Sequence, residues 1–291
     1  MSIKVGDIVA RASYQYDLLF RVIELKDIGS QTIAILYGEE FRLIADSPID
    51  DLRIVQEAEY REKGEQTLKQ IEQSYQLFQR DYLEMREKRK YEATNGYRAD
   101  VNFFQIPGRV LHIDGDQQYL KKCIDMYNKM GIPIEGIHCK ETEMPSQIGH
   151  LLDHYRPDIL VVTGHDAYTK SNGPKNNLES YRHSRFFVET VKEARKKYPS
   201  LDQLVIFAGA CQSHFEAIIR AGANFASSPT RVNIHALDPV YIVGKISFTS
   251  FMERVNVWEV VRNTITGEKG IGGIETKGIL RTGLPFQYLE E

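Results

Sequence analysis

The feature that most constrains the fold is a regular alternation, from Pro107 onward, of short apolar runs and longer amphipathic stretches. Continuous Val, Ile and Leu runs between helical stretches are typical of parallel strands that are covered on both faces. The alternation therefore predicts an α/β fold with a doubly wound, mainly parallel sheet. The expected strands are GRVLHID (108–114), IPIEGIHC (132–139), DILVVTG (158–164) and DQLVIFAG (202–209).

Two further regions precede this part of the chain. Residues 1–56 contain short β-branched and aromatic runs separated by Gly, Asp and Ser, which predicts a small β-barrel. The opening VGDIV and the later FRVI resemble SH3-like and KOW-type barrels. Residues 57–100 are rich in Glu, Lys, Gln and Arg, with apolar residues three and four positions apart, so we expect a helical linker. The α/β domain then spans residues 101–291.

Composition excludes several classes of function. The chain has 40 acidic and 37 basic residues, so its net charge of -3 gives no bulk field that would hold nucleic acid or an anionic membrane. It contains neither a basic segment followed by a long apolar run at the N-terminus nor an uninterrupted apolar run long enough to span a bilayer. Cys123, Cys139 and Cys211 show no CxxC spacing, which fits a reducing compartment. We expect a cytoplasmic protein with neither membrane nor nucleic-acid partners; the sequence leaves its oligomeric state open.

Reactive side chains follow two of the expected strands. His165 comes just after DILVVTG, and Cys211 comes just after DQLVIFAG. Consecutive parallel strands tend to be neighbours and to end at the same edge of the sheet, so these side chains can meet. A nearby imidazole and the N-terminus of a helix expected in 213–223 would both favour a thiolate. The pattern predicts a dyad with Cys211 as nucleophile and His165 as base. The alternative is a buried core cysteine and a capping histidine.

A strand ending in histidine, followed about fifty residues later by a strand ending in Ala-Cys, resembles the caspase/hemoglobinase-like cysteine peptidases. Over nearly its whole length the chain is also similar to a family of sporulation-specific proteases of endospore-forming bacteria. The matching segments are RPDILVVTGHDAY (156–168), QLVIFAGACQSHFEA (203–217) and GANFASSPTRVNIHALDPVY (222–241). This resemblance implies a caspase-like fold, with the N-terminal barrel as part of the family pattern. It also implies a cysteine endopeptidase, without cofactor or metal, that acts on spore coat and other sporulation proteins in the mother cell, at the forming coat.

The resemblance also implies an oxyanion hole formed by the backbone amides of Asp166 and Cys211. Caspase-like enzymes usually carry a small residue where Asp166 stands. The role of its carboxylate stays open: it either turns away from substrate or orients the imidazole.

Caspase-like enzymes take part of their specificity pocket from the end of the first strand, which here reads HIDGD. Asp114 and Asp116 are therefore expected to pair with a basic substrate side chain, with Asp114 preferred, so that cleavage follows Arg. The alternative is an acidic turn that caps the next helix. Ser227 and Ser228 are expected to form another wall of the pocket.

Other histidines and cysteines are weaker candidates. His214 lies on the helix expected after Cys211, and the strand-end position favours His165 over it. The HLLDH segment lacks the Glu of a zinc-protease HExxH helix, and we expect no metal. Cys123 lies on an apolar helical stripe and is expected in the core.

Two competing functions and one form of self-processing remain. GACQS loosely resembles the nucleophile elbow of glutamine amidotransferases, but His235 is not followed by the Glu of an H-x-E motif. The second alternative is a non-catalytic coat or RNA-binding protein organised by the barrel and the helix. Self-cleavage is expected, if it occurs, in the Arg-containing linker segment RDYLEMREKRK (80–90).

Overall fold

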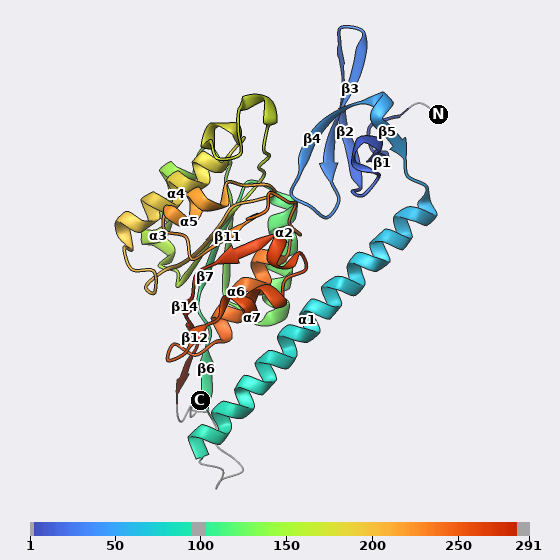
Figure 1. Cartoon of the computed structure of the whole chain (residues 1–291). Coiled ribbons are helices and arrows are strands. Elements are labelled where there is room, and N and C mark those ends of the chain that lie inside the picture. Colours follow the sequence, from blue (N-terminus) through green and yellow to red (C-terminus); the bar gives the residue numbers. More distant parts are fainter. Residues whose placement is uncertain (1–2, 95–102, 284–291) are drawn as a thin grey trace, which may run out of the picture.

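The computed structural model describes residues 3–94 and 103–283, which form a small antiparallel sheet, a long helix and a larger body built on a second sheet (Figure 1). The first sheet, called the N-terminal sheet below, has the strand order β4-β3-β2-β1-β5, and every neighbouring pair is antiparallel. Its strands are β1 (Ile8–Arg11), β2 (Phe20–Ile28), β3 (Gln31–Gly38), β4 (Ile44–Pro48) and β5 (Leu52–Ile54).

Helix α1 (Glu57–Thr94) runs from the N-terminal sheet along the side of the larger body (Figure 1). Side chains three and four residues apart pack on the core of the larger body, which accounts for the apolar stripe seen in the sequence. They are Ile71, Tyr75, Phe78, Tyr82 and Met85. The segment 80–90 lies within this helix. Within the described ranges, no helix combines the length and the apolar character needed to cross a bilayer.

The larger body contains a mainly parallel sheet with the strand order β13-β11-β10-β9-β7-β8, called the central sheet below. Only β13, at one edge, runs antiparallel to its neighbour. The predicted α/β class with a mainly parallel sheet is thereby confirmed. The strands are β7 (Val110–Asp114), β8 (Ile134–His138), β9 (Ile159–Thr163), β10 (Val205–Ala208), β11 (Phe225–Ser227) and β13 (Ile271–Gly273).

Helices cover both faces of the central sheet. Side chains of α2 (Gln117–Met130), α6 (Asp238–Phe248) and α7 (Val257–Arg262) share one apolar core with one face. Side chains of α3 (Met144–Tyr155), α4 (Ser184–Lys197) and α5 (Phe215–Arg220) share a second core with the other face. Both sides of each strand are therefore buried, which explains the continuous apolar runs.

Two short strand pairs complete the larger body. β6 (Phe104–Ile106) pairs with β15 (Arg281–Gly283), and β12 (Arg254–Val255) pairs with β14 (Thr276–Lys277), both antiparallel.

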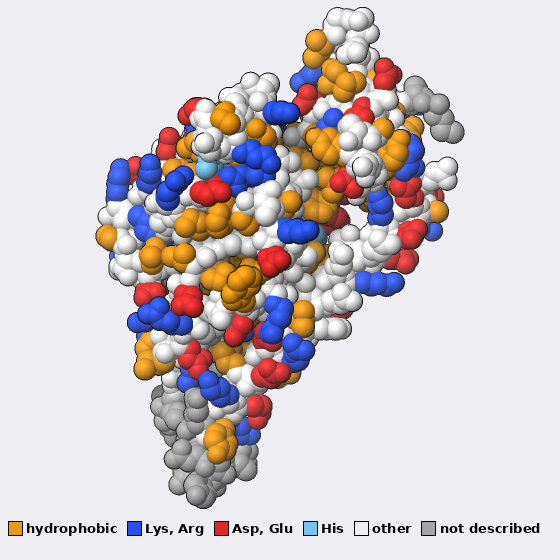
Figure 2. Space-filling model, viewed as in Figure 1, with side chains coloured by type: hydrophobic (Ala, Val, Ile, Leu, Met, Phe, Trp, Pro, Cys, Tyr) orange, Lys and Arg blue, Asp and Glu red, His pale blue; other side chains and the backbone are white. Residues whose placement is uncertain are grey.

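The direction of winding reverses at β7, whose neighbours are β8 on one side and β9 on the other. In open α/β sheets, ligands bind beyond the carboxyl ends of the strands at such a reversal. Asp114 and Thr163, the last residues of β7 and β9, are paired at this point. The N-terminal sheet meets the larger body at this edge, where Phe41 forms a β-bridge with His235. Figure 2 shows hydrophobic side chains gathered where the two parts meet.

Candidate active site

His165 lies directly after β9 and is held between two carboxylates. Its ring Nε2 is 3.2 Å from Oδ2 of Asp116, and its Nδ1 is 3.6 Å from Oε1 of Glu141. Burial opposes protonation of the ring, but the two carboxylates outweigh it and raise the pKa of His165 to about 9. The imidazole is therefore protonated at neutral pH in this conformation.

The two carboxylates come from different strand ends. Asp116 caps α2, since its Oδ1 accepts hydrogen bonds from the amides of Gln118 and Tyr119 at 2.8 and 2.9 Å. Asp116 is therefore the helix cap that was the alternative to a substrate-binding role for the HIDGD turn, and it also contacts His165.

Glu141 follows β8, and its place in the site was not predicted from the sequence. Its Oε1 accepts a hydrogen bond from the His165 amide at 2.7 Å. A side chain on Gly115 or Gly164 would overlap this carboxylate, so these glycines make room for it. The signal that could have revealed Glu141 is its position just beyond the carboxyl end of a third strand.

Cys211 lies after β10 and is completely buried. Its Sγ accepts a hydrogen bond from the amide of Ile234 at 3.4 Å. Burial raises the pKa of the Cys211 thiol to about 12, despite this hydrogen bond. Cys211 is therefore a protonated thiol, covered by the segment that contains Ile234.

His165 and Cys211 lie at the same edge of the central sheet, because β9 and β10 are neighbouring parallel strands. Across residues 3–94 and 103–283, however, no hydrogen bond or ion pair links the His165 ring to the Cys211 thiol. The two side chains share an edge without forming a bonded pair in this conformation.

The Asp166 carboxylate points away from the imidazole and joins several loops. Its Oδ1 accepts a hydrogen bond from the His183 amide at 2.8 Å, and its Oδ2 accepts hydrogen bonds from the hydroxyls of Ser184 and Ser213. The Ser213 hydroxyl in turn accepts the Ala210 amide at 2.9 Å. Asp166 thus connects the loop after β9 with the loop after β10.

The backbone amides of Asp166 and Cys211 are unusual. Both residues are at least 99 % buried, with exposed fractions of 1% and 0%. Among the contacts of the described residues, neither amide donates a hydrogen bond. Buried N–H groups without an acceptor are rare in folded proteins.

Ser227 and Ser228 support the loop around Cys211. The Ser227 hydroxyl donates to the carbonyl oxygen of Ala210, and the Ser228 hydroxyl donates to that of Val232, both at 2.7 Å. Both hydroxyls are therefore engaged within the protein.

Asp114 is completely buried and forms an ion pair with Arg42, which follows strand β3 of the N-terminal sheet. Burial favours the neutral carboxyl group, but Arg42 outweighs it and holds the pKa of Asp114 well below its usual range. Asp114 Oδ2 also accepts a hydrogen bond from the Thr163 hydroxyl at 2.9 Å. Arg42 was not predicted, because no local pattern of residues marks a side chain that is buried by a distant part of the chain.

An open groove of 480 Å³ lies beside His165, and it is bordered by residues of both parts of the molecule. Asp116, Glu141 and His165 line its inner side, while Ile44 of β4 and Arg182 lie at its border. Arg182 donates a hydrogen bond to the carbonyl oxygen of Ile44 at 3.3 Å, which connects the two borders.

The remaining candidates have structural contacts. His214 Nε2 lies 3.2 Å from the carbonyl oxygen of Asn176, and His214 Nδ1 accepts the Ala217 amide at the start of α5. Cys123 is buried in the core, as predicted. Within the described residues, no three His, Cys, Asp or Glu side chains form a group that could hold a metal ion.

Two comparisons with known proteins cover almost the whole chain. The family model described as YabG peptidase U57 matches residues 4–285. The sporulation-specific protease YabG of Bacillus subtilis (strain 168) is 59% identical over 288 residues, which are 99% of this chain and 99% of that protein.

Proposed function

The chain belongs to the YabG peptidase family U57 and is thus a peptidase with protein substrates, and on this premise we propose that it is a cysteine endopeptidase of sporulation with Cys211 as nucleophile and His165 as base. The single observation that carries the proposal is that His165 and Cys211 directly follow the neighbouring parallel strands β9 and β10. This arrangement brings a thiol and an imidazole to one edge of a sheet, where α/β proteins place their chemistry.

In the proposed reaction, His165 first releases its proton to solvent; the neutral imidazole then takes the thiol proton of Cys211, and the resulting thiolate attacks the carbonyl carbon of the scissile peptide bond. The unpaired amides of Asp166 and Cys211 supply two donors for the oxyanion that forms. When the C–N bond breaks, the His165 imidazolium gives its proton to the departing amine, and water then hydrolyses the thioester with His165 as base. Because Cys211 is buried beneath Ile234, the segment around Ile234 has to move before substrate enters.

We assign cleavage after Arg to this enzyme, with Asp114 as the partner of the substrate guanidinium. The carboxylate is ionised and already binds a guanidinium in this structure. Planar guanidinium groups match carboxylates better than ammonium groups do, which favours Arg over Lys. Asp116 acts through His165, which it contacts, and Ser227 and Ser228 shape the pocket by holding the loop of Cys211.

The relative's name supports a role in sporulation, and we extend it to the processing of spore coat and other sporulation proteins in the mother cell. We assign residues 101–291 to the caspase/hemoglobinase-like fold and residues 1–56 to the SH3-like barrels. Residues 57–100 form the linker between them in this division. Self-cleavage within 80–90 would require local unfolding, since α1 is helical there and peptidases bind extended chains.

The test compares four proteins: wild type, Cys211→Ala, His165→Ala and the matched control Cys139→Ala. Each is incubated with casein and with a set of peptides that differ in the residue before the scissile bond. Cys139 is also a buried cysteine but packs on the opposite face of the sheet. We expect cleavage, mainly after Arg, by wild type and Cys139→Ala only. Equal cleavage by all four proteins would refute the dyad.

A non-catalytic coat or RNA-binding protein predicts instead that Cys211→Ala changes nothing, and membership of a peptidase family argues against it. An amidotransferase-like hydrolase would release ammonia from glutamine. The histidine that this class of enzyme would use as its base is His235. Burial lowers the pKa of His235 to about 3, so it is a weak base in this structure.

A further inference from the structure

Arg42 is an unusual residue for its position, because it belongs to the N-terminal sheet's connection between β3 and β4 yet is fully buried in the larger body. Besides Asp114, its Nη1 contacts the Thr163 hydroxyl at 3.2 Å, and its Nη2 donates to the carbonyl oxygen of Ala236 at 3.1 Å. These groups lie at the end of β7, at the end of β9 and just before α6, around the reversal point of the sheet. They form a ready-made pocket for one guanidinium group.

The backbone that carries Arg42, residues 38–43, is called the docking loop here. The larger body binds the carbonyl oxygens of four of its residues, in contacts that would suit any peptide chain. The Tyr119 hydroxyl contacts those of Gly38 and Phe41, the Lys122 ammonium donates to that of Glu39 at 3.1 Å, and the Ala236 amide donates to that of Glu40 at 3.2 Å. Backbone contacts with a single side-chain pocket are a general way to recognise peptides.

The docking loop also lies next to segments that contact the candidate catalytic residues. The ring of Tyr37, the residue just before the loop, lies 6.3 Å from the ring of His165, with its plane at 64° to it. Phe41 bridges to His235, in the same segment that covers Cys211. The docking loop therefore already occupies the edge of the sheet at which a peptide substrate would bind.

The loop is not itself presented for cleavage. The Leu43 amide donates to the carbonyl oxygen of Phe41 at 2.6 Å, and the Gly38 amide donates to that of Leu43 at 2.9 Å. Arg42 therefore lies at the centre of a tight turn that closes on itself, whereas a scissile peptide is bound in extended form. The loop fills the pocket without offering its peptide bond to the thiol.

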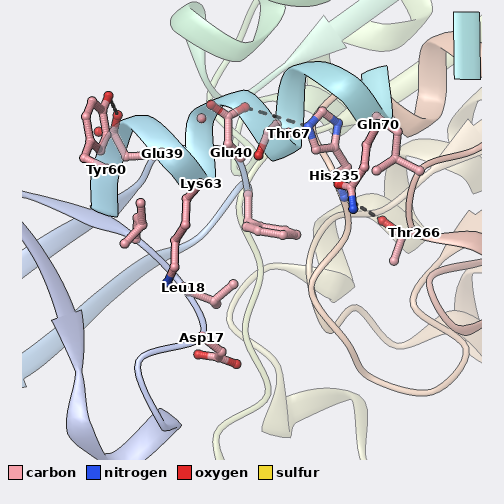
Figure 3. Close-up of a pocket in the computed structure, with 14 residues that line it drawn as sticks. Asp17, Leu18, Glu39, Glu40, Tyr60, Lys63, Thr67, Gln70, His235 and Thr266 are labelled. Carbon is pink, nitrogen blue, oxygen red and sulfur yellow. Dashed lines mark hydrogen bonds and ion pairs between the residues drawn. The ribbon is translucent and has the colours of Figure 1, made fainter. Parts of the chain in front are cut away.

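Space beside the loop permits it to withdraw. A pocket of 310 Å³ lies between the loop, helix α1 and the segments around His235 and Thr266. Figure 3 shows both acidic side chains of the loop at this pocket, with Glu39 beside Tyr60 of α1 and Glu40 beside His235. The loop is thus packed against the catalytic edge on one side and against a cavity on the other.

We propose that Arg42 is an internal mimic of the substrate's arginine, which keeps the peptidase latent until the docking loop leaves the guanidinium pocket of Asp114, Thr163 and the Ala236 carbonyl group. The inference rests on the proposed function for the meaning of the pocket. The pocket itself can be tested without any cleavage.

The first experiment measures binding of agmatine, a small guanidinium compound, by calorimetry, with putrescine as the primary-amine control. It uses the full chain as Cys211→Ala and as Arg42→Ala/Cys211→Ala. We expect agmatine to bind the double variant at least about tenfold more tightly than the single variant, and putrescine to bind neither, since vacating an occupied site removes the penalty of opening it. Arg42→Gln replaces Arg42→Ala if thermal unfolding shows that the alanine variant does not fold.

The second experiment measures kcat/KM for peptides with Arg or Leu before the scissile bond. Arg42→Gln is compared with wild type and with Arg53→Gln, a matched control whose arginine pairs with Glu59 on the surface. We expect a rise of about tenfold or more for the Arg peptide with Arg42→Gln, and none with Arg53→Gln.

The outcomes separate this inference from the proposed function. Agmatine binding to the double variant together with no cleavage by any variant would support the pocket and refute the proposed cysteine endopeptidase with Cys211 and His165. Cleavage that depends on Cys211 but does not increase in Arg42→Gln, or equal agmatine binding by both variants, would overturn the latency while the peptidase stands.

Discussion

The Ser213 hydroxyl donates a hydrogen bond to the Asp166 carboxylate at 2.8 Å, and this contact ties the loop after Cys211 to the loop after His165. The same carboxylate accepts the amide of His183 and the hydroxyl of Ser184 at the start of α4. One buried acid therefore fixes the relative position of the two loops that carry the proposed dyad. It does so without contacting the imidazole.

Asp166→Ala should lower the free energy of unfolding by about 3 kcal/mol or more, since it leaves several buried donors without an acceptor. It should also reduce peptide cleavage strongly. Urea unfolding and the peptide assay measure the two effects. Asp153→Ala removes an exposed acid that pairs with Lys197, and should change neither quantity by much. Unfolding of Asp166→Ala at the wild-type urea concentration would contradict the prediction.

Asp116→Asn should weaken the dependence of stability on alkaline pH. His165 has a folded pKa of about 9, above its ordinary value of 6.5, so its contribution is complete below pH 6.5 and is lost as the pH rises through 9. Without the Asp116 charge, the decline in unfolding free energy over this interval should shrink by about 1–3 kcal/mol. Denaturant unfolding at several pH values measures it.

Asparagine is also a good helix N-cap, so Asp116→Asn keeps the cap of α2. Asp125→Asn on the exposed side of α2 is the control. If wild type and Asp116→Asn lose stability in parallel from pH 6.5 to 9, the ion pair with His165 does not hold in solution.

Gly209→Ala should be strongly destabilising, by about 2 kcal/mol or more. Gly209 has φ of 112°, where other residues are strained, and an added methyl group would overlap the Ser227 hydroxyl. Because Gly209 lies two residues before Cys211, cleavage should fall as well. Gly149→Ala within α3 is the control, since a methyl group there meets only Cε of Lys197 at 3.7 Å and alanine favours helices. Equal thermal midpoints for the two variants would reject this role of Gly209.

Arg42 and Asp114 should be strongly coupled in a double-mutant cycle of unfolding free energies. Each single change, Arg42→Gln or Asp114→Asn, leaves one buried charge without its partner, whereas the double change leaves none. We expect the double variant to be more stable than the sum of the single effects by about 1.5 kcal/mol or more. Additive effects would indicate that the pair does not form in solution.

The sequence predicted the larger body well because its signals are local. Apolar runs between helical stretches indicate buried parallel strands wherever they occur, and the strands around Ile159 and Val205 appear where expected. Right-handed connections between neighbouring strands bring the residues that follow them to one edge. The position of His165 and Cys211 at the same edge follows from these rules alone.

The contacts of these residues could not be predicted in this way. Glu141 lies beside His165 because two glycines on other loops leave space for its carboxylate, and no local pattern reports that space. The thiol of Cys211 is buried because the segment around Ile234 folds over it. Its raised pKa is a consequence of that packing.

By itself, then, the sequence determined the α/β architecture and the edge where His165 and Cys211 lie, because periodicity and strand connections act over short stretches of chain. Only the tertiary structure decided what surrounds them. Arg42 and Asp114 are 72 residues apart in the chain and belong to different sheets, and their ion pair exists because the two sheets dock. A buried charge is stable only where an opposite charge is placed to offset the cost of its desolvation. That placement depends on the packing of distant segments, which a linear pattern of residues does not encode.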